Sequence, residues 1–309
     1  MTQGTNISRR GLAVQVSGEW YVLAAAILWG TTGTAQALAP ADAQPAAIGT
    51  IRLVIGGITL LVVALARRAF RPSEQWSPLE LLFAGGGIAA YQLFFFAGVD
   101  RTGVAAGTVV AIGSAPIFAG LLGFLVRDER PGARWVGATT LAILGCSLLI
   151  AASGDLGIDP LGFLLALGAG LAYATYAVAS KGLLAQHSPD AVQAAVFCLG
   201  AVFLIPVLLT SDLSWLKQVH GIAAAFHLGL IATALAYLLF ARGLRLIPVA
   251  NAVTLSLAEP LTAALLGLLL LREQITMISL MGMALLFAGL LILATPSRKA
   301  PQIESGKQP

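Results

Sequence analysis

The sequence predicts an all-α integral membrane protein whose ten transmembrane helices form two inverted five-helix repeats. Three observations lead to this fold class: the composition, an internal repeat and the positions of the basic residues. Of the 309 residues, 58% are hydrophobic and 10% are charged, whereas about a quarter of the residues of a soluble domain are charged. A chain of this composition needs the lipid bilayer as its solvent.

The transmembrane helices are predicted from continuous apolar runs. A helix needs about 20 mostly apolar residues to cross about 30 Å of hydrocarbon. The strands of a β-barrel would instead be short segments in which apolar and polar residues alternate, and these runs do not alternate. The predicted spans are residues 20–39, 46–66, 79–98, 104–126, 134–152, 160–180, 190–210, 219–241, 249–271 and 276–294.

The chain also repeats itself without gaps at a spacing of 144 residues. The matching residues are Pro116 and Pro260, Glu129 and Glu273, Gly18 and Gly162, Thr31 and Thr175, Pro45 and Pro189, Gly85 and Gly229, Phe96 and Phe240, Gly123 and Gly267, and Gly145 and Gly289. We therefore expect a first repeat over residues 18–150 and a second over residues 162–294. Because each repeat has an odd number of helices, the two would cross the bilayer in opposite directions, as in many secondary transporters.

Lys and Arg concentrate in one set of alternate loops, which marks these loops as cytoplasmic. Of the 18 basic residues, the fourteen on this side are Arg9, Arg10, Arg67, Arg68, Arg71, Arg127, Arg130, Arg134, Lys181, Arg242, Arg245, Arg298, Lys299 and Lys307. Only Arg101, Lys217 and Arg272 lie on the other side. We expect a multi-pass protein of the bacterial inner (plasma) membrane, with residues 1–17 and 295–309 as cytoplasmic tails. The net charge of +4 therefore reflects topology and does not indicate nucleic-acid binding.

One sequence element occurs in both halves. Its first copy reads Ala115-Pro116-Ile117-Phe118-Ala119-Gly120-Leu121-Leu122, then Arg127-Asp128-Glu129-Arg130 and Leu144-Gly145-Cys146. Its second copy reads Ala258-Glu259-Pro260-Leu261-Thr262-Ala263-Ala264-Leu265-Leu266-Gly267, then Arg272-Glu273 and Phe287-Ala288-Gly289-Leu290. Together with Trp29-Gly30 and Tyr173-Ala174-Thr175-Tyr176, these residues resemble the ten-helix EamA-type family of the drug/metabolite transporter superfamily, over about residues 18–294.

The resemblance implies a secondary active transporter, more often an exporter, that moves a small organic solute such as an amino acid or an amphipathic cation. Protons or another ion would drive the transport. The sequence contains no phosphate-binding glycine loop, nucleophile elbow or metal-ligand cluster, so it indicates neither an enzyme nor a protein that depends on a cofactor or a metal. Uptake of a metabolite stays open, as does a membrane sensor or assembly protein that transports nothing.

Two charged residues lie inside predicted spans, where a charge is costly and indicates a function. Glu259 is near the middle of the ninth span, and Arg52 is about six residues into the second. The functional interpretation is that Glu259 binds a proton or a cationic group of the solute, while Arg52 binds a carboxylate or pairs with Glu259. Pro260 would kink or loosen the helix beside Glu259. The structural alternative is a plain ion pair, or an Arg52 whose guanidinium reaches the membrane surface.

Polar and aromatic residues on four further helix faces are candidates for the solute site. They could line a central cavity in which aromatic rings hold a flat or cationic solute, or they could only join helices and fill the core. These candidates are Asn251 and Thr254 on the face of Glu259, Tyr173 and Tyr176 in the sixth span, Trp29 and Gln36 in the first, and Tyr91 and Gln92 in the third.

Two further patterns favour structural roles. Glu129 and Glu273 each precede a helix in a short turn, where a carboxylate complements the positive end of the helix dipole. The small residues at Gly162, Ala166 and Gly170 would allow close helix contact. Because that contact could lie within one chain or between two, the protein could be a monomer or a homodimer.

Overall fold

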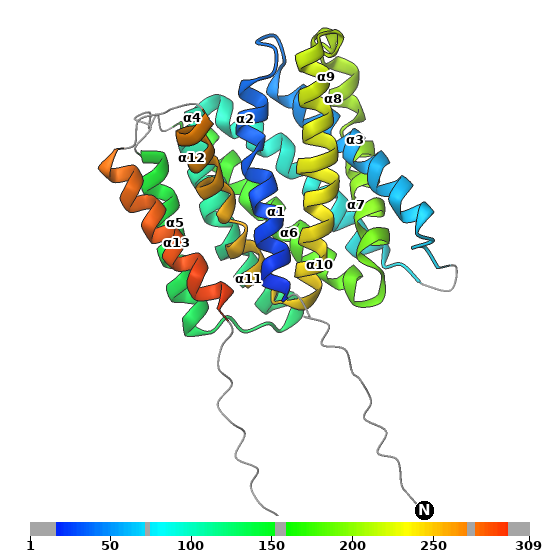
Figure 1. The fold of residues 1–309 in the computed structure, drawn as a ribbon. Coiled ribbons are helices and arrows are strands. Elements are labelled where there is room, and N and C mark those ends of the chain that lie inside the picture. The colour runs from blue at the N-terminus through cyan, green and yellow to red at the C-terminus, as the bar shows by residue number, and fades with distance from the viewer. Residues whose placement is uncertain (1–16, 72–74, 152–158, 271–275, 296–309) are drawn as a thin grey trace, which may run out of the picture.

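The computed structural model describes residues 17–71, 75–151, 159–270 and 276–295 (Figure 1). Within these ranges every regular element is a helix. In chain order they are α1 (Gly18–Gly30), α2 (Thr32–Ala37), α3 (Pro45–Ala66), α4 (Pro78–Arg127), α5 (Ala133–Ala151), α6 (Pro160–Gln186), α7 (Pro189–Phe203), α8 (Ile205–Thr210), the 3₁₀ helix η1 (Ser214–Lys217), α9 (Val219–Phe226), the π-helix η2 (His227–Leu235), α10 (Ala236–Leu246), α11 (Val249–Leu255), α12 (Ala258–Leu270) and α13 (Met277–Ala294).

Seven helical stretches of the described residues are long and apolar enough to cross a membrane. They are Pro45–Ala66, Pro78–Gly103, Val110–Arg127, Pro160–Gln186, Val219–Leu246, Val249–Leu270 and Met277–Ala294. Two shorter apolar helices, Ala133–Leu149 and Pro189–Phe203, fall in two other predicted spans. Large apolar side chains such as Leu209 and Val219, each 79% exposed, lie on the outer surface, as expected of a surface that faces lipid. The all-helical membrane fold predicted from the sequence is thus confirmed.

Several predicted spans contain a break in the helix. The first is divided at Thr31, whose hydroxyl donates to the Leu28 carbonyl and is also hydrogen-bonded to Nε2 of His227, 2.8 Å away. His227 is the first residue of the π-helix η2, so two irregular points on neighbouring helices are joined. In α4 the backbone turns at Gly103, where a φ of 80° and a ψ of 158° suit a residue without a side chain.

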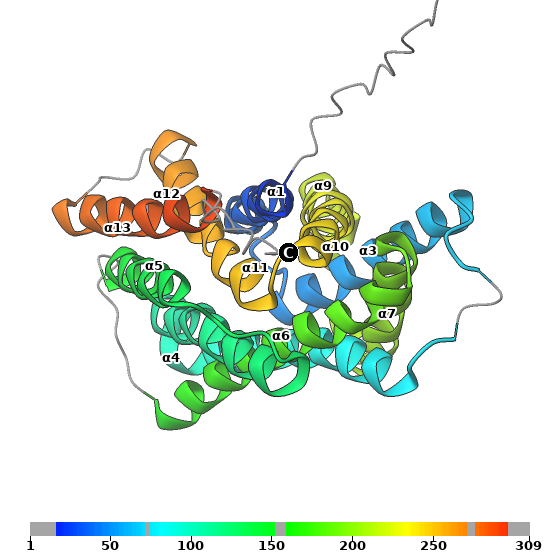
Figure 2. The same ribbon diagram turned by 90° about the horizontal axis from the view of Figure 1, so that it is seen from below.

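The helices pack in pairs that relate the two halves of the chain. α5 packs along α13, α3 along α7, α1 along α10, and α4 along α6; the first two pairs lie side by side in Figure 2. The stripe Gly162, Ala166 and Gly170 faces α4 of the same chain: a Cβ on Gly170 would lie 2.8 Å from the Ala111 carbonyl oxygen, and one on Gly98 would lie 3.0 Å from the Ala166 nitrogen. The close contact predicted from this stripe is therefore made within one chain.

Glycines show that some contacts between the halves are reciprocal. A Cβ on Gly145 of α5 would lie 2.6 Å from the carbonyl oxygen of Gly282 in α13. A Cβ on Gly289 of α13 would lie 2.6 Å from the carbonyl oxygen of Ala138 in α5. Gly289 follows Gly145 by 144 residues, and Gly282 follows Ala138 by the same number. The second contact is therefore the first with the two halves exchanged.

The same exchange relates two contacts elsewhere in the bundle. A Cβ on Gly56 of α3 would lie 3.2 Å from the carbonyl oxygen of Gly229 in η2, and one on Gly200 of α7 would lie 3.3 Å from that of Gly85 in α4. These two pairs are again 144 residues apart. Equivalent residues of the two halves thus occupy equivalent places in the packing.

Because the backbones of α5 and α13 nearly touch, we expect Gly145→Leu to destabilise the protein by about 3 kcal/mol, the upper end of the usual cost of overpacking. Gly137→Leu is the matched control, since Gly137 lies on the same helix and a Cβ there meets no atom within 4 Å. Thermal unfolding in detergent should show a lower midpoint for the first variant only. Equal midpoints for the two variants would contradict the close packing.

The start of α1 and the end of α13 lie at the same end of the bundle, the lower end in Figure 1. Ion pairs of the loops that the sequence assigns to the cytoplasm include Arg67 with Asp190 at 2.8 Å and Arg127 with Glu80 at 2.5 Å. We call the end of the bundle where α1 begins and α13 ends the terminal end.

Candidate functional site

A cavity of about 970 Å³ lies inside the bundle, bordered by α1, α2, α3, α4, α5, α6, α10, α12 and α13. This volume is at the upper end of the range in which small-molecule sites fall. Seven of the ten residues predicted for the solute site line the cavity: Trp29, Gln36, Arg52, Tyr91, Gln92, Tyr173 and Glu259. Residues from the first, second, third, sixth and ninth predicted spans thus meet in one space.

Glu259 lies next to a break in the ninth predicted span. α11 ends at Leu255 and α12 begins at Ala258, so Glu259 is in the first turn of α12, where the helix dipole favours a negative charge. The break lies in the turn before Pro260, as expected of a proline, which cannot bond the carbonyl four residues before it and is tolerated in the first turn of the helix that follows. Gly30 of α1 comes close to this turn: a Cβ on Gly30 would lie 2.9 Å from the Glu259 carbonyl oxygen.

Arg52 faces the same cavity from α3 and is held by its neighbour on α4. Its Nη2 donates to Oε1 of Gln92 at 3.2 Å, and Nε2 of Gln92 donates to the carbonyl oxygen of Gly49 at 3.0 Å. Arg52 and Glu259 are both half-buried, and their charges act on each other across the cavity. No nitrogen of Arg52 lies within 4.0 Å of the Glu259 carboxylate, so a direct ion pair is not formed in this structure.

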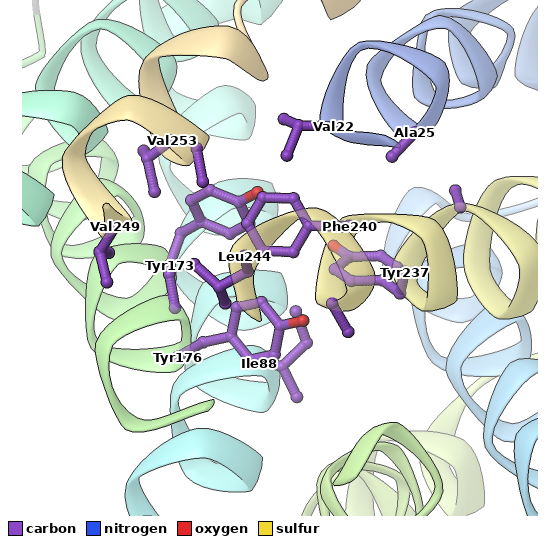
Figure 3. Packing of buried hydrophobic residues seen from close by; sticks show 14 of the residues in the cluster. Val22, Ala25, Ile88, Tyr173, Tyr176, Tyr237, Phe240, Leu244, Val249 and Val253 are labelled. Carbon is purple, nitrogen blue, oxygen red and sulfur yellow. The ribbon is translucent and has the colours of Figure 1, made fainter. Parts of the chain in front are cut away.

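Aromatic rings form the floor of the cavity. Trp29 lies between Tyr237, with ring centroids 4.7 Å apart, and Tyr173, with centroids 6.5 Å apart and nearly perpendicular planes. The ring of Tyr91 also packs on Tyr173, with ring centroids 5.6 Å apart. Figure 3 shows Tyr173 and Tyr237 gathered around Phe240, close to side chains of α1 and α11. Each ring therefore fixes the orientation of its neighbours.

Three predicted site residues do not line the cavity. Tyr176 is completely buried below Tyr173, and its hydroxyl donates to Oε1 of Gln193 at 3.2 Å. Thr254 is also completely buried and is hydrogen-bonded to side chains of α5. Asn251 is partly exposed on α11, away from the cavity. For Tyr176 and Thr254 the structure shows helix-to-helix packing, which is the structural alternative stated for the polar faces.

Among the cavity residues that were not predicted from the sequence are Tyr237 on α10 and Ser256 in the break between α11 and α12. Ser256 precedes Glu259 by three residues, a spacing that places two side chains on one face of a helix, so its position carried a usable signal. Tyr237 follows Thr233 by four residues, a spacing that likewise places two side chains on one face, so its position carried a similar signal. In the described residues no group of three or more His, Cys, Asp or Glu side chains could hold a metal ion.

The cavity extends toward one end of the bundle and is closed at the other. α2, which supplies Gly33 and Gln36 to its lining, lies at the end opposite to the terminal end (Figure 1). At the terminal end Thr254 of α11 is hydrogen-bonded to the Thr139 hydroxyl at 2.9 Å and to Nε1 of Trp135 at 3.0 Å, both on α5. These contacts and the aromatic floor separate the cavity from the terminal end.

Two further contacts strengthen the closed end. Oε2 of Glu129 accepts a hydrogen bond from the backbone N–H of Val249, the first residue of α11, at 2.7 Å. The sequence predicted that Glu129 complements the dipole of the helix that directly follows it, whereas in the structure its carboxylate contacts the start of α11. The equivalent residue, Glu273, lies outside the described residues. Nζ of Lys181 donates to the carbonyl oxygens of Leu244 and Ile247 at 2.6 and 2.8 Å, and so caps the end of α10.

The fold and the cavity define a helical membrane protein with a solute-sized internal site, which is the class of a membrane transporter. Residues 16–151 and residues 160–295 each match the EamA-like transporter family. An uncharacterized transporter of Bacillus subtilis, YwfM, is 46% identical over 92% of this chain and 96% of its own. The threonine/homoserine exporter RhtA of Escherichia coli is 27% identical over 92% of each chain.

A solved crystal structure has the same fold, with a TM-score of 0.78 and 23% identity over 90% of this chain and 96% of the other. The chain therefore belongs to the EamA-like transporter family, as the resemblance predicted. It is a membrane transporter and not an enzyme.

Proposed function

We propose that this protein is a secondary active exporter of a small organic metabolite, such as an amino acid or an amphipathic cation. The observation that carries the proposal is the pair of opposite charges, Glu259 and Arg52, placed in one cavity without a direct ion pair. A charge that has no ionic partner in the membrane is available for a solute or a proton. The name of RhtA, a threonine/homoserine exporter, supports export of a solute of this size.

In this proposal each charge has its own task. Glu259 binds the cationic group of the solute or a proton, and Arg52, oriented by Gln92, binds a carboxylate. Tyr91 and Tyr173 contact the apolar body of the solute with their ring faces, where a cationic group is also attracted. Gln36 lies nearer the open end and contributes an amide that can donate and accept hydrogen bonds.

We further propose that ten transmembrane helices form two inverted repeats, over residues 18–150 and 162–294. The two family matches and the reciprocal glycine contacts support two equivalent halves. The breaks at Thr31 and before Ala258 then lie within single membrane crossings. Both chain ends would be cytoplasmic in the bacterial inner membrane, because the basic loops lie at the end where α1 begins and α13 ends. The cavity then opens away from the cytoplasm.

Transport would proceed by alternating access of the central site to the two sides. The hydrogen bond between Thr254 and Thr139 would then hold the cytoplasmic side closed. In the opposite state the equivalent positions of the other half, Val110 and Met283, would close the outer side. Met283 lines the cavity in this structure, as expected if Val110 and Met283 are apart in this state.

Solute flux into and out of proteoliposomes tests the proposal. Purified protein is reconstituted, amino acids and cationic dyes are supplied, and a proton gradient is imposed or omitted. We expect saturable movement of at least one solute class, faster with the gradient than without it. If solutes move only in the direction of uptake, export is wrong; if no solute of either class moves, the assigned substrate classes are wrong.

A further inference from the structure

The floor of the cavity holds hydrogen-bond donors that have no partner in the protein. Nε1 of Trp29 and the hydroxyl of Tyr173 are both shielded from solvent and make no hydrogen bond of standard geometry, although the Ser256 side chain lies close to the Tyr173 hydroxyl. Both residues line the cavity. Trp29 is 5% exposed and Tyr173 is 8% exposed. An unpaired polar group in such a place is costly, so its presence indicates a partner that is absent from the protein itself.

The two donors cannot turn to find partners elsewhere. The indole of Trp29 is fixed between the rings of Tyr237 and Phe240, with centroids 4.7 and 5.4 Å away. The Tyr173 ring is fixed by Tyr91 at 5.6 Å and by Phe240 at 6.2 Å. Rings held in this way present their N–H and O–H groups in a constant direction, which is the requirement for a selective site.

The two residues are also equivalent positions of the two halves. Tyr173 follows Trp29 by 144 residues, the spacing at which the reciprocal glycine contacts recur. Each half thus supplies one aromatic ring with a donor, and the two rings meet edge to face with centroids 6.5 Å apart. A solute bound between these two rings would contact both halves of the protein.

The chemistry of the unpaired groups restricts what they bind. An indole N–H only donates, and a phenol hydroxyl donates while its oxygen can accept. Nε of Arg52, another donor, is likewise shielded and unpaired. Glu259, the one carboxylate among the described residues that line the cavity, is an acceptor that suits an ammonium group. The site therefore fits a compact amine that also carries an oxygen acceptor.

We propose that Trp29 and Tyr173 are the specificity-determining pair of this transporter, and that they hydrogen-bond an acceptor oxygen of an amine solute. The inference rests on the proposed function, because it assigns a task to two residues of the same site. The acceptor oxygen comes either from a hydroxyl or from the carboxylate of the solute. A solute without that oxygen leaves both donors unpaired and is rejected, as in other sites that recognise a hydrogen-bonding group.

Binding to purified protein in lipid nanodiscs, measured by calorimetry, tests the pair independently of transport. Three probes are used: threonine, valine, which replaces the threonine hydroxyl by a methyl group, and isobutylamine, which is valine without its carboxylate. Tyr173→Phe removes one hydroxyl and keeps the ring. Tyr176→Phe is the matched control, because its hydroxyl is bonded to Gln193 outside the cavity.

We expect Tyr173→Phe to lower one of two affinity ratios by about tenfold, with no change in Tyr176→Phe. A fall in the threonine-to-valine ratio identifies a hydroxyl as the acceptor, and a fall in the valine-to-isobutylamine ratio identifies the carboxylate. Trp29→Phe should lower the same ratio and serves if Tyr173→Phe does not fold.

The inference is overturned if neither ratio changes by more than about twofold in both variants, including the case in which the wild-type protein binds all three probes equally. If the protein binds the probes selectively but moves no solute in proteoliposomes, the proposed function is wrong. The role of Trp29 and Tyr173 in selective binding would then still hold.

Discussion

Replacing Glu259 by glutamine should reduce gradient-driven solute flux by about 100-fold. Glutamine has nearly the same shape as glutamate but carries no negative charge, so it cannot attract an ammonium group or exchange a proton. The charge pair lost is that of the Glu259 carboxylate with the cationic group of the solute. Removing one partner of such a desolvated pair costs about 2–5 kcal/mol, and each loss of about 1.36 kcal/mol lowers a rate tenfold. Flux is measured in proteoliposomes at matched protein content, with and without an imposed proton gradient.

Glu19→Gln is the control for the Glu259 variant. Glu19 is a partly exposed carboxylate in the first turn of α1, outside the cavity, so its loss removes an equal charge without touching the site. Flux through this control should equal that of the wild-type protein, and flux through Glu259→Gln should no longer respond to the gradient. If the Glu259 variant keeps the wild-type rate and its response to pH, this carboxylate is not the coupling group.

The sequence predicts the fold class of this protein well, because a bilayer imposes long apolar helices that can be read from composition. Its helix breaks are less predictable. The division at Thr31 depends on side-chain hydrogen bonds, including one to His227 on a distant helix. The break before Ala258 was predictable, since it lies at Ser256 and Leu257, within the turn that Pro260 disrupts by removing the hydrogen bond to the Ser256 carbonyl. The division at Thr31 was not, because it follows from a tertiary contact that local composition does not contain.

The candidate site was predictable where a residue is unusual for a membrane. Glu259 and Arg52 stand out in any apolar span, and both line the cavity. Polar periodicity was a weaker guide, since Thr254 lies on a polar face but uses its hydroxyl to join α11 to α5. Tyr176 follows Tyr173 by less than one helical turn, yet only Tyr173 reaches the cavity. Which of two neighbouring tyrosines lines a cavity depends on the packing of other helices.

Two cysteine pairs at equivalent positions should report the two access states. Thr139 and Thr254, whose hydroxyl oxygens are 2.9 Å apart, are close enough for a disulfide if both are replaced by cysteine. Met283 follows Thr139 by 144 residues, and Val110 precedes Thr254 by the same number. Alternating access of two equivalent halves predicts that Val110 and Met283 meet when Thr139 and Thr254 separate.

The pairs are introduced into a chain in which both native thiols, Cys146 and Cys198, are replaced by alanine. Neither native cysteine is in a disulfide, so the background should fold and transport as the wild-type protein does. Each single-cysteine variant is the control for its pair. Crosslinking is scored by gel mobility under oxidising conditions, and flux is measured before and after reduction.

The central claim is that one site is opened alternately to the two sides by two inverted halves, and crosslinking of Val110→Cys with Met283→Cys tests it most directly. We expect this disulfide to form faster when transported solute is present, while the Thr139→Cys with Thr254→Cys disulfide forms more slowly. Each disulfide should stop flux until it is reduced. If the Val110–Met283 pair never crosslinks during turnover, or if protein locked at positions 139 and 254 still transports, the account is wrong.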